Sequence, residues 1–125
     1  MSRPRILLVD DDPAVRSSIA FALEIEGFDV ATFGSAEALL SVGVAAPHAC
    51  MVFDHRLPGL DGLALLAALR IRGEQAPAII ITSNPPQRLR QRVLDAGARL
   101  VEKPLLSDAL VAAVREAASR EGSAR

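Results

Sequence analysis

The chain has 125 residues, of which half are hydrophobic and 23% are charged, and its net charge is −1. This length leaves room for one domain with one core, and the composition excludes a disordered chain. No block of like charge suggests direct nucleic-acid binding, and no apolar stretch approaches the ~20 residues that cross a membrane. The first apolar run is too short for a signal peptide, so we expect a cytoplasmic protein.

Short apolar runs rich in β-branched residues predict strands, and apolar residues at helical spacing predict helices between them. The strands are expected over residues 5–9, 29–33 and 49–53, from Pro77 onward, and over residues 99–102. The helices are expected from Pro13, capped by Asp11 or Asp12, to Gly27; from Ser35 to about Gly43; from Leu63 to about Gly73; from after Pro86 to Gly97; and from a cap at Ser107 onward. The apolar stripes of the first and fourth helices are expected to include Ala22 and Ala96.

Strand and helix alternate five times, which predicts an α/β fold with a parallel sheet covered by helices on both faces. Right-handed crossovers restrict the topology, and the doubly wound, flavodoxin-like strand order 2-1-3-4-5 is the common arrangement at this size. With no repeat or linker, residues 1–125 are expected to form a single domain with a core over about residues 5–118. Residues 119–125 are expected to be a polar tail that frays from Glu121.

Four of the predicted strands stop abruptly at polar residues. Asp10 and Asp11 follow the first strand, Asp54 the third, Thr82 the fourth, and Lys103 the fifth. In open α/β sheets, ligands bind outside the carboxyl ends of the strands. The order 2-1-3-4-5 places the first and third strands side by side, so the three carboxylates are expected to converge there.

Carboxylates that are packed together repel each other unless a cation is present, and hard oxygen ligands with open positions suit Mg²⁺. A metal, the ammonium of Lys103 and the hydroxyl of Thr82 around a carboxylate suit a transferring phosphoryl group. A carboxylate that accepts this group becomes an aspartyl phosphate. Each residue also has an ordinary interpretation: Asp12 caps a helix, Thr82 is a turn residue, and Lys103 is solvated.

Taken together, the strand ends resemble a known family. The segments that carry the resemblance are residues 7–12 (LLVDDD), 54–62 (DHRLPGLDG), 81–83 (ITS) and 102–104 (EKP). The chain resembles the receiver domain of bacterial two-component response regulators, the CheY-like family, over about Arg5 to Ala118.

This resemblance implies that Asp54 is the phosphoacceptor of a two-component phosphorelay. It would take the phosphoryl group from a phosphohistidine on a sensor histidine kinase or a histidine phosphotransfer protein. The resemblance also implies that Asp11 and Asp54 bind Mg²⁺ directly, that Asp10 helps through water, and that the backbone carbonyl of Arg56 is a further ligand.

The same resemblance implies roles for the remaining strand ends. Lys103 pairs with the phosphoryl group, and Thr82 hydrogen-bonds it and moves the loop that follows. The peptide bond before Pro104 is expected to be cis, and Asp61-Gly62 shapes the loop before the third helix. The protein is therefore expected to be a signalling switch with a downstream protein target, and not an enzyme, a membrane protein or a direct nucleic-acid binder.

The sequence departs from the family in the switch region. Leu100 stands where many members carry Tyr or Phe, which puts the usual coupling of the threonine to a ring rotation in doubt. Asn84-Pro85-Pro86 is an unusually stiff start to the segment after Thr82. Arg56 either leans over the phosphoryl site or is a solvated charge at its rim.

The two histidines, the single cysteine and a group of three arginines are expected to be ordinary structural or surface residues. His48 is expected in a surface loop, His55 has no expected ligand role, and Cys50 is expected to be a buried, unreactive thiol. A solvated face is expected for residues 88–92, where Arg88, Arg90 and Arg92 alternate with other residues.

Two other functions remain open from the residues alone. A Mg²⁺-dependent phosphohydrolase with an aspartyl nucleophile typically has a second acid two residues after the nucleophile, where this chain has Arg56. A flavodoxin-like cofactor carrier would have a Gly- or Ser/Thr-rich phosphate loop after the first strand. Here Asp10-Asp11-Asp12 stands at that position and would repel a phosphate in the absence of metal.

Overall fold

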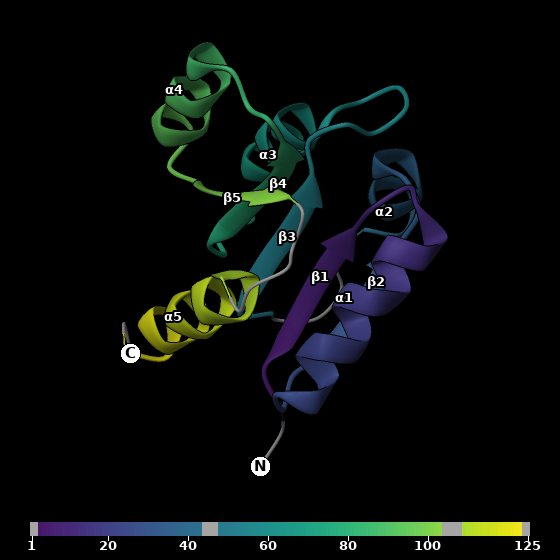
Figure 1. The fold of residues 1–125 in the computed structure, drawn as a ribbon, viewed down its shortest axis with the longest axis vertical. Helices are drawn as coiled ribbons and strands as arrows, with labels where there is room; N and C mark the ends of the chain where they lie inside the picture. Colours follow the sequence, from purple (N-terminus) through teal and green to yellow (C-terminus); the bar gives the residue numbers. More distant parts are fainter. Residues whose placement is uncertain (1–2, 44–47, 104–108, 124–125) are drawn as a thin grey trace.

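The structure is a computed structural model that describes residues 3–43, 48–103 and 109–123. Strands and helices alternate along the chain (Figure 1). The strands are β1 (Arg5–Val9), β2 (Asp29–Phe33), β3 (Cys50–Asp54), β4 (Ala78–Ser83) and β5 (Arg99–Lys103). The helices are α1 (Pro13–Ile25), α2 (Ala36–Val42), α3 (Gly62–Ile71), α4 (Gln87–Asp95) and α5 (Ala109–Ser123). All pairs of neighbouring strands are parallel, and the order β2-β1-β3-β4-β5 confirms the predicted topology.

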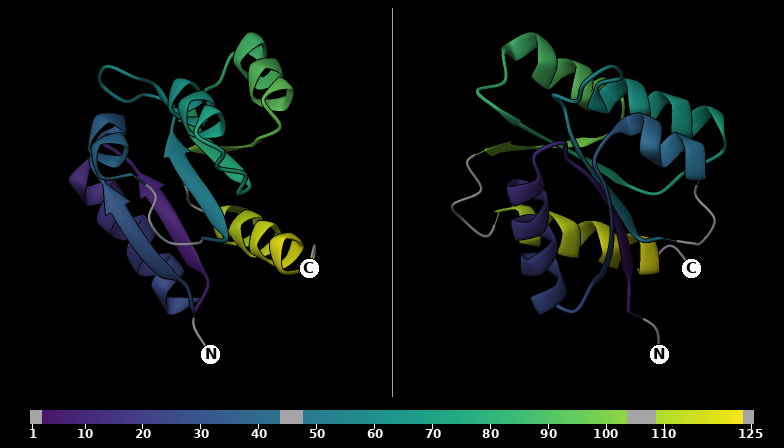
Figure 2. Two further views of the ribbon diagram at one scale, coloured as in Figure 1. Left: turned by 180° about the vertical axis from the view of Figure 1, so that it is seen from behind. Right: turned by 90° about the vertical axis from the view of Figure 1, so that its right-hand side faces the viewer.

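The sheet lies between two layers of helices, which the right-hand view of Figure 2 shows from the edge. Because successive strand residues point to opposite faces, each central strand feeds two cores. One core lies under α2, α3 and α4 and contains Met51, Phe53 and Ile80. The other lies under α1 and α5 and contains Val52 and Ile79. Every residue of β3 is buried, which explains why its sequence lacks a polar alternation.

The helix starts follow the capping residues. Asp12, and not Asp11, caps α1, because its Oδ1 accepts hydrogen bonds from Ala14 N at 2.9 Å and Val15 N at 3.3 Å. The Ser35 hydroxyl caps α2 in the same way, at 3.0 Å from Ala38 N. As expected, the two prolines delay the fourth helix, which begins at Gln87. The expected cap at Ser107 and the bond before Pro104 lie outside the described residues.

Several local expectations are wrong. His48 is buried and not on the surface, because its ring packs inside and its Nε2 lies 3.4 Å from Glu74 Oε1. Ala22 and Ala96 are exposed, since both lie at the margin of their apolar stripes. The last helix continues to Ser123, and the expected fraying from Glu121 stays a prediction. Within the described ranges, no helix has the length and apolar character needed to cross a membrane.

Candidate functional site

Three carboxylates meet at the carboxyl ends of β1 and β3. The parallel register that pairs Val9 with Phe53 brings these two strand ends side by side. Asp10 and Asp11 follow β1, and Asp54 is the last residue of β3. One carboxylate oxygen from each of the three aspartates lies within 4.8 Å of the others. The predicted convergence is therefore observed.

Asp10 is the most constrained member of this cluster. It is fully buried, and its Oδ1 accepts a hydrogen bond from Asp12 N at 3.0 Å, whereas its buried Oδ2 accepts no hydrogen bond from the residues that the structure describes. Burial raises the pKa of Asp10 above its usual value of 3.8; the hydrogen bond from Asp12 opposes this shift, and the charge of Asp54 adds to it. A buried carboxylate beside two other carboxylates, with one oxygen that lacks a hydrogen bond from the described residues, fits a bound cation.

Lys103 supplies the one ammonium described in this cluster. Its Nζ lies 3.0 Å from Asp54 Oδ2 and 3.6 Å from Asp10 Oδ2. Partial burial lowers the pKa of Lys103, but the hydrogen bond and charge of Asp54, followed by the charge of Asp10, outweigh that effect and leave the pKa raised. Lys103 therefore remains a cation and offsets part of the negative charge.

Asp54 is held at both of its carboxylate oxygens. Oδ2 accepts from Lys103, and Oδ1 accepts a hydrogen bond from Arg56 N at 3.1 Å. These two donors fix the orientation of the carboxylate, which is 5% exposed. The side chain of Arg56 is exposed, in agreement with a solvated rim charge.

Gly62 must be a glycine because the chain turns back over Asp54. A Cβ at this position would lie 2.6 Å from Asp54 O and 3.1 Å from His55 Cα, both of which are backbone atoms. The preceding Asp61 caps α3 through a hydrogen bond of 2.8 Å from Ala64 N. The expectation that Asp61-Gly62 shapes this loop is therefore confirmed.

Thr82 lies at the same end of the sheet and is 2% exposed. The register pairs Asp54, the last residue of β3, with Ile81 of β4, so Thr82 lies one residue further along the sheet than Asp54. Its hydroxyl makes no hydrogen bond to another described residue. The sheet thus places Thr82 near the cluster, and only Asp10, Asp11, Asp54 and Lys103 are in close contact.

The segment after Thr82 contains an unusual backbone conformation, and its expected stiffness stays a prediction. Asn84 has a φ of 44°, a left-handed conformation that is uncommon for residues other than glycine. Pro85 is buried, and Pro86 precedes α4. Leu100 is partly buried and packs against the core under α2, α3 and α4.

Sequence reasoning missed Arg16. Its guanidinium Nη1 donates a hydrogen bond to the backbone carbonyl of Asp10 at 2.7 Å and thereby ties α1 to the loop that carries two of the carboxylates. The sequence feature that could have indicated this contact is an arginine one turn into the helix that follows the acidic loop.

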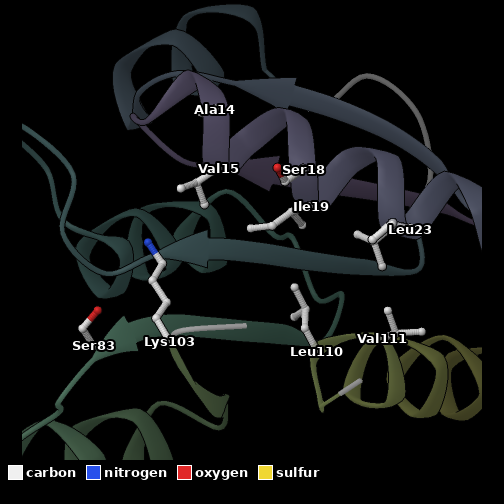
Figure 3. Close-up of a pocket in the computed structure, with 10 residues that line it drawn as sticks. Ala14, Val15, Ser18, Ile19, Leu23, Ser83, Lys103, Leu110 and Val111 are labelled. Carbon is white, nitrogen blue, oxygen red and sulfur yellow. The ribbon is translucent and has the colours of Figure 1, made fainter. Parts of the chain in front are cut away.

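A groove between α1 and α5 adjoins the cluster. Figure 3 shows Lys103 and Ser83 at one end of this groove, and Ile19, Leu23 and Leu110 along it. Its lining is mainly apolar, so an apolar surface lies directly beside the charged site.

This fold and this cluster define a receiver domain. The sequence profile of the family described as the response regulator receiver domain matches residues 6–115, and the chain belongs to that family. Its function is accordingly that of a phosphoacceptor switch in two-component signalling. The alternative functions considered above receive no support from the relatives.

Individual relatives agree with this assignment. The transcriptional regulatory protein FixJ of Azorhizobium caulinodans is 40% identical over 114 residues, which cover 90% of this chain and 54% of FixJ. PrrA of Mycobacterium tuberculosis is 37% identical and covers 98% of this chain and 53% of PrrA. The chain therefore spans about half the length of these curated relatives.

Solved structures show the same similarity. The structure named FixJ-N has a TM-score of 0.83 at 33% identity and covers 96% of each chain. A CheY-like receiver domain protein from Methanospirillum hungatei has a TM-score of 0.88 at 28% identity and covers 99% of this chain and all of its own.

Proposed function

We propose that Asp54 is the phosphoacceptor of this receiver domain. A carboxylate oxygen of Asp54 attacks the phosphorus of a phosphohistidine on a sensor histidine kinase or a histidine phosphotransfer protein. The new O–P bond forms as the P–N bond breaks, and the bonding pair returns to the imidazole nitrogen of the donor. The observation that carries this assignment is the position of Asp54: it is oriented at both oxygens and shares the cluster with two further carboxylates.

The same cluster is proposed to hold Mg²⁺. Asp10, Asp11 and Asp54 supply hard oxygen ligands, together with the backbone carbonyl of Arg56. The Oδ2 of Asp10, which accepts no hydrogen bond from a described residue, supports a cation there. Bound Mg²⁺ would neutralise charge on the phosphoryl oxygens. Lys103 is proposed to pair with those oxygens, which would replace its present contact with Asp54 Oδ2.

Thr82 is proposed to hydrogen-bond the phosphoryl group and so to begin the switch. In this chain Leu100 has no ring or hydroxyl to follow that movement, and Pro85 and Pro86 restrict the backbone after Thr82. The phosphoryl group adds roughly −1.5 to −2 charges, which can reorder neighbouring loops directly. We therefore expect the output to be carried mainly by charge and loop position near Asp54 and Lys103.

Residues 1–125 are proposed to be one receiver domain in the cytoplasm, with a downstream protein as its target and with no direct contact to nucleic acid or membrane. The domain is proposed to act as a switch and not as an enzyme. A phosphohydrolase would need an acid where the exposed Arg56 stands.

Intact-mass spectrometry tests the acceptor. With Mg²⁺ and acetyl phosphate, the protein should gain one acid-labile phosphoryl group, and Asp54→Asn should gain none because the nucleophilic charge is lost. Asp95→Asn, which removes an exposed carboxylate on α4, serves as the matched control and should be labelled like the wild type. Equal labelling of Asp54→Asn would show that the acceptor is another residue.

A further inference from the structure

The loop between β3 and α3, residues 55–61, carries the Arg56 carbonyl and is fastened near both of its ends. At the start, Arg56 N donates to Asp54 Oδ1, and Leu57 is buried in the core. At the far end, Gly62 N donates to His55 O at 3.1 Å. These contacts close the base of the loop and leave its tip, residues 58–60, to be held in another way.

The tip is held by a side chain from α2. Glu37 Oε2 accepts a hydrogen bond from Leu60 N at 3.3 Å, and this is the one hydrogen bond of residues 58–60 within the described part of the chain. Figure 1 shows this loop extending beside α2. Glu37 lies in the first turn of that helix, where the helix dipole stabilises a negative charge.

The carboxylate of Glu37 also packs closely against the loop. A Cβ at Gly59 would lie 2.7 Å from Glu37 Oε2, and Gly59 has a φ of 76°, a conformation that L side chains rarely adopt. The sequence therefore provides both the space and the backbone conformation that allow Glu37 to reach Leu60. Glu37 lies outside the carboxylate cluster of Asp10, Asp11 and Asp54, so its role is not that of a metal ligand.

We propose that Glu37 is a positioning residue that fastens the tip of the β3–α3 loop to α2 and thereby sets the affinity of the metal site. The inference rests on the proposed function, because it acts through the Arg56 carbonyl at the base of the same loop. When the tip is free, the loop samples more conformations, and ordering the carbonyl against a bound cation costs conformational entropy. Coupling of this kind is reciprocal, so binding of Mg²⁺ strengthens the Glu37–Leu60 contact in turn.

Amide NMR on the unphosphorylated protein tests this role with two readouts, the Mg²⁺ dissociation constant and the hydrogen exchange of the Leu60 amide. Glu37→Ala should weaken Mg²⁺ binding by about two- to fivefold, the range of an exposed charged contact, and should speed exchange at Leu60 in the metal-free protein. Addition of Mg²⁺ should slow that exchange in the wild type. Gly59→Ala, which crowds the Glu37 carboxylate, should change both readouts in the same direction.

Two variants separate positioning from helix stability. Glu37→Gln loses the charge that favours the first turn of α2 but keeps an oxygen acceptor for Leu60 N. Because the contact with the loop is kept, this variant should have the Mg²⁺ binding and the Leu60 exchange of the wild type. Glu24→Ala removes an exposed glutamate from α1 and controls for the change in net charge. If Glu37 only stabilised its helix, Glu37→Gln would behave like Glu37→Ala in stability and neither would change Mg²⁺ binding.

The outcomes distinguish this inference from the proposed metal site. Wild-type protein that binds no Mg²⁺ would contradict the metal site and, with it, the coupling. Wild-type binding that is unchanged in Glu37→Ala, or changed equally in Glu24→Ala, would contradict the coupling alone.

Discussion

Replacement of Asp10 by Asn should stabilise the metal-free protein. Asn keeps an Oδ1 acceptor for Asp12 N, so the existing hydrogen bond of 3.0 Å is retained and only the charge is removed. That charge is fully buried, and one of its oxygens accepts no hydrogen bond within the described part of the chain. The substitution therefore isolates the free energy by which the buried charge of Asp10 destabilises the metal-free fold.

The magnitude follows from the neighbouring charges and from burial. Repulsion from Asp54, no more than 4.8 Å away, is at least about 3.5 kcal/mol at an effective dielectric constant of about 20, and Asp11 adds further repulsion. Attraction to Lys103 at 3.6 Å is about 5 kcal/mol on the same basis, so the neighbouring charges together give no net attraction. Removal of the carboxylate from water costs several kcal/mol, and these charges do not offset that cost. We expect Asp10→Asn to raise the free energy of unfolding by about 1–3 kcal/mol.

The pH dependence gives a second test of the same balance. Because burial raises the folded-state pKa of Asp10 above 3.8, the folded protein binds this proton more readily than the unfolded chain. Wild-type stability attributable to Asp10 is therefore highest below the unfolded pKa and is lost as pH rises through the raised folded pKa. The advantage of Asp10→Asn over wild type should be full at pH 7.5 and should disappear as the pH falls toward 3.8.

Urea unfolding in EDTA measures this difference, and Asp11→Asn is the matched control because it removes an exposed charge from the same cluster. The control should change stability by less than Asp10→Asn. With Mg²⁺ present, the wild type should recover stability, and Asp10→Asn should recover less. If Asp10→Asn were less stable than wild type in EDTA at pH 7.5, the reasoning that burial outweighs the pairing with Lys103 would be refuted.

The remaining predictions concern packing and charge around the site. Gly62→Ala should lower the free energy of unfolding in urea by about 1–3 kcal/mol, because the added Cβ would meet backbone atoms. Gly34→Ala is the control and should lower it by less, because its Cβ would meet only the movable Arg16 guanidinium, at 3.2 Å. Equal losses in the two variants would contradict the backbone contact at Gly62. Lys103→Ala should destabilise the metal-free protein by about 1–3 kcal/mol, since two carboxylates lose their cation, and added Mg²⁺ should reduce the loss; unchanged unfolding in EDTA would argue against the pairing. Burial raises the pKa of Cys50 to about 12, so a thiol reagent at pH 8 should label it only on unfolding, and rapid labelling of the native protein would disprove its burial.

The sequence predicted the order of the strands and the polar residues that end them. This was possible because strands buried on both faces are continuous apolar runs, and the change to Asp10, Asp54, Thr82 or Lys103 marks the carboxyl end of each run. Parallel strands then bring these ends to one edge, so a one-dimensional pattern determines a three-dimensional site.

The sequence did not predict how burial differs within the site. Asp10 and Asp11 are adjacent and chemically identical, yet Asp10 is fully buried and Asp11 is exposed. Asp10 directly follows the buried strand β1, whereas Asp11 lies in the bend that comes after it. The burial of His48 was missed for a related reason: its partner Glu74 lies on a separate loop that only the folded sheet brings near. Such contacts between distant segments leave no periodic signal.

The turn between α3 and β4 divides the chain so that each part holds half of the site. Asp10 and Asp54 precede this turn, Thr82 and Lys103 follow it, and Gly73 within it is exposed. Two fragments separated at Gly73 would each present an open strand edge, β3 in one and β4 in the other, and these edges are complementary. Phosphoryl labelling would then require reassociation of the fragments, so the domain could serve as a split reporter whose chemical signal appears only when its two halves meet.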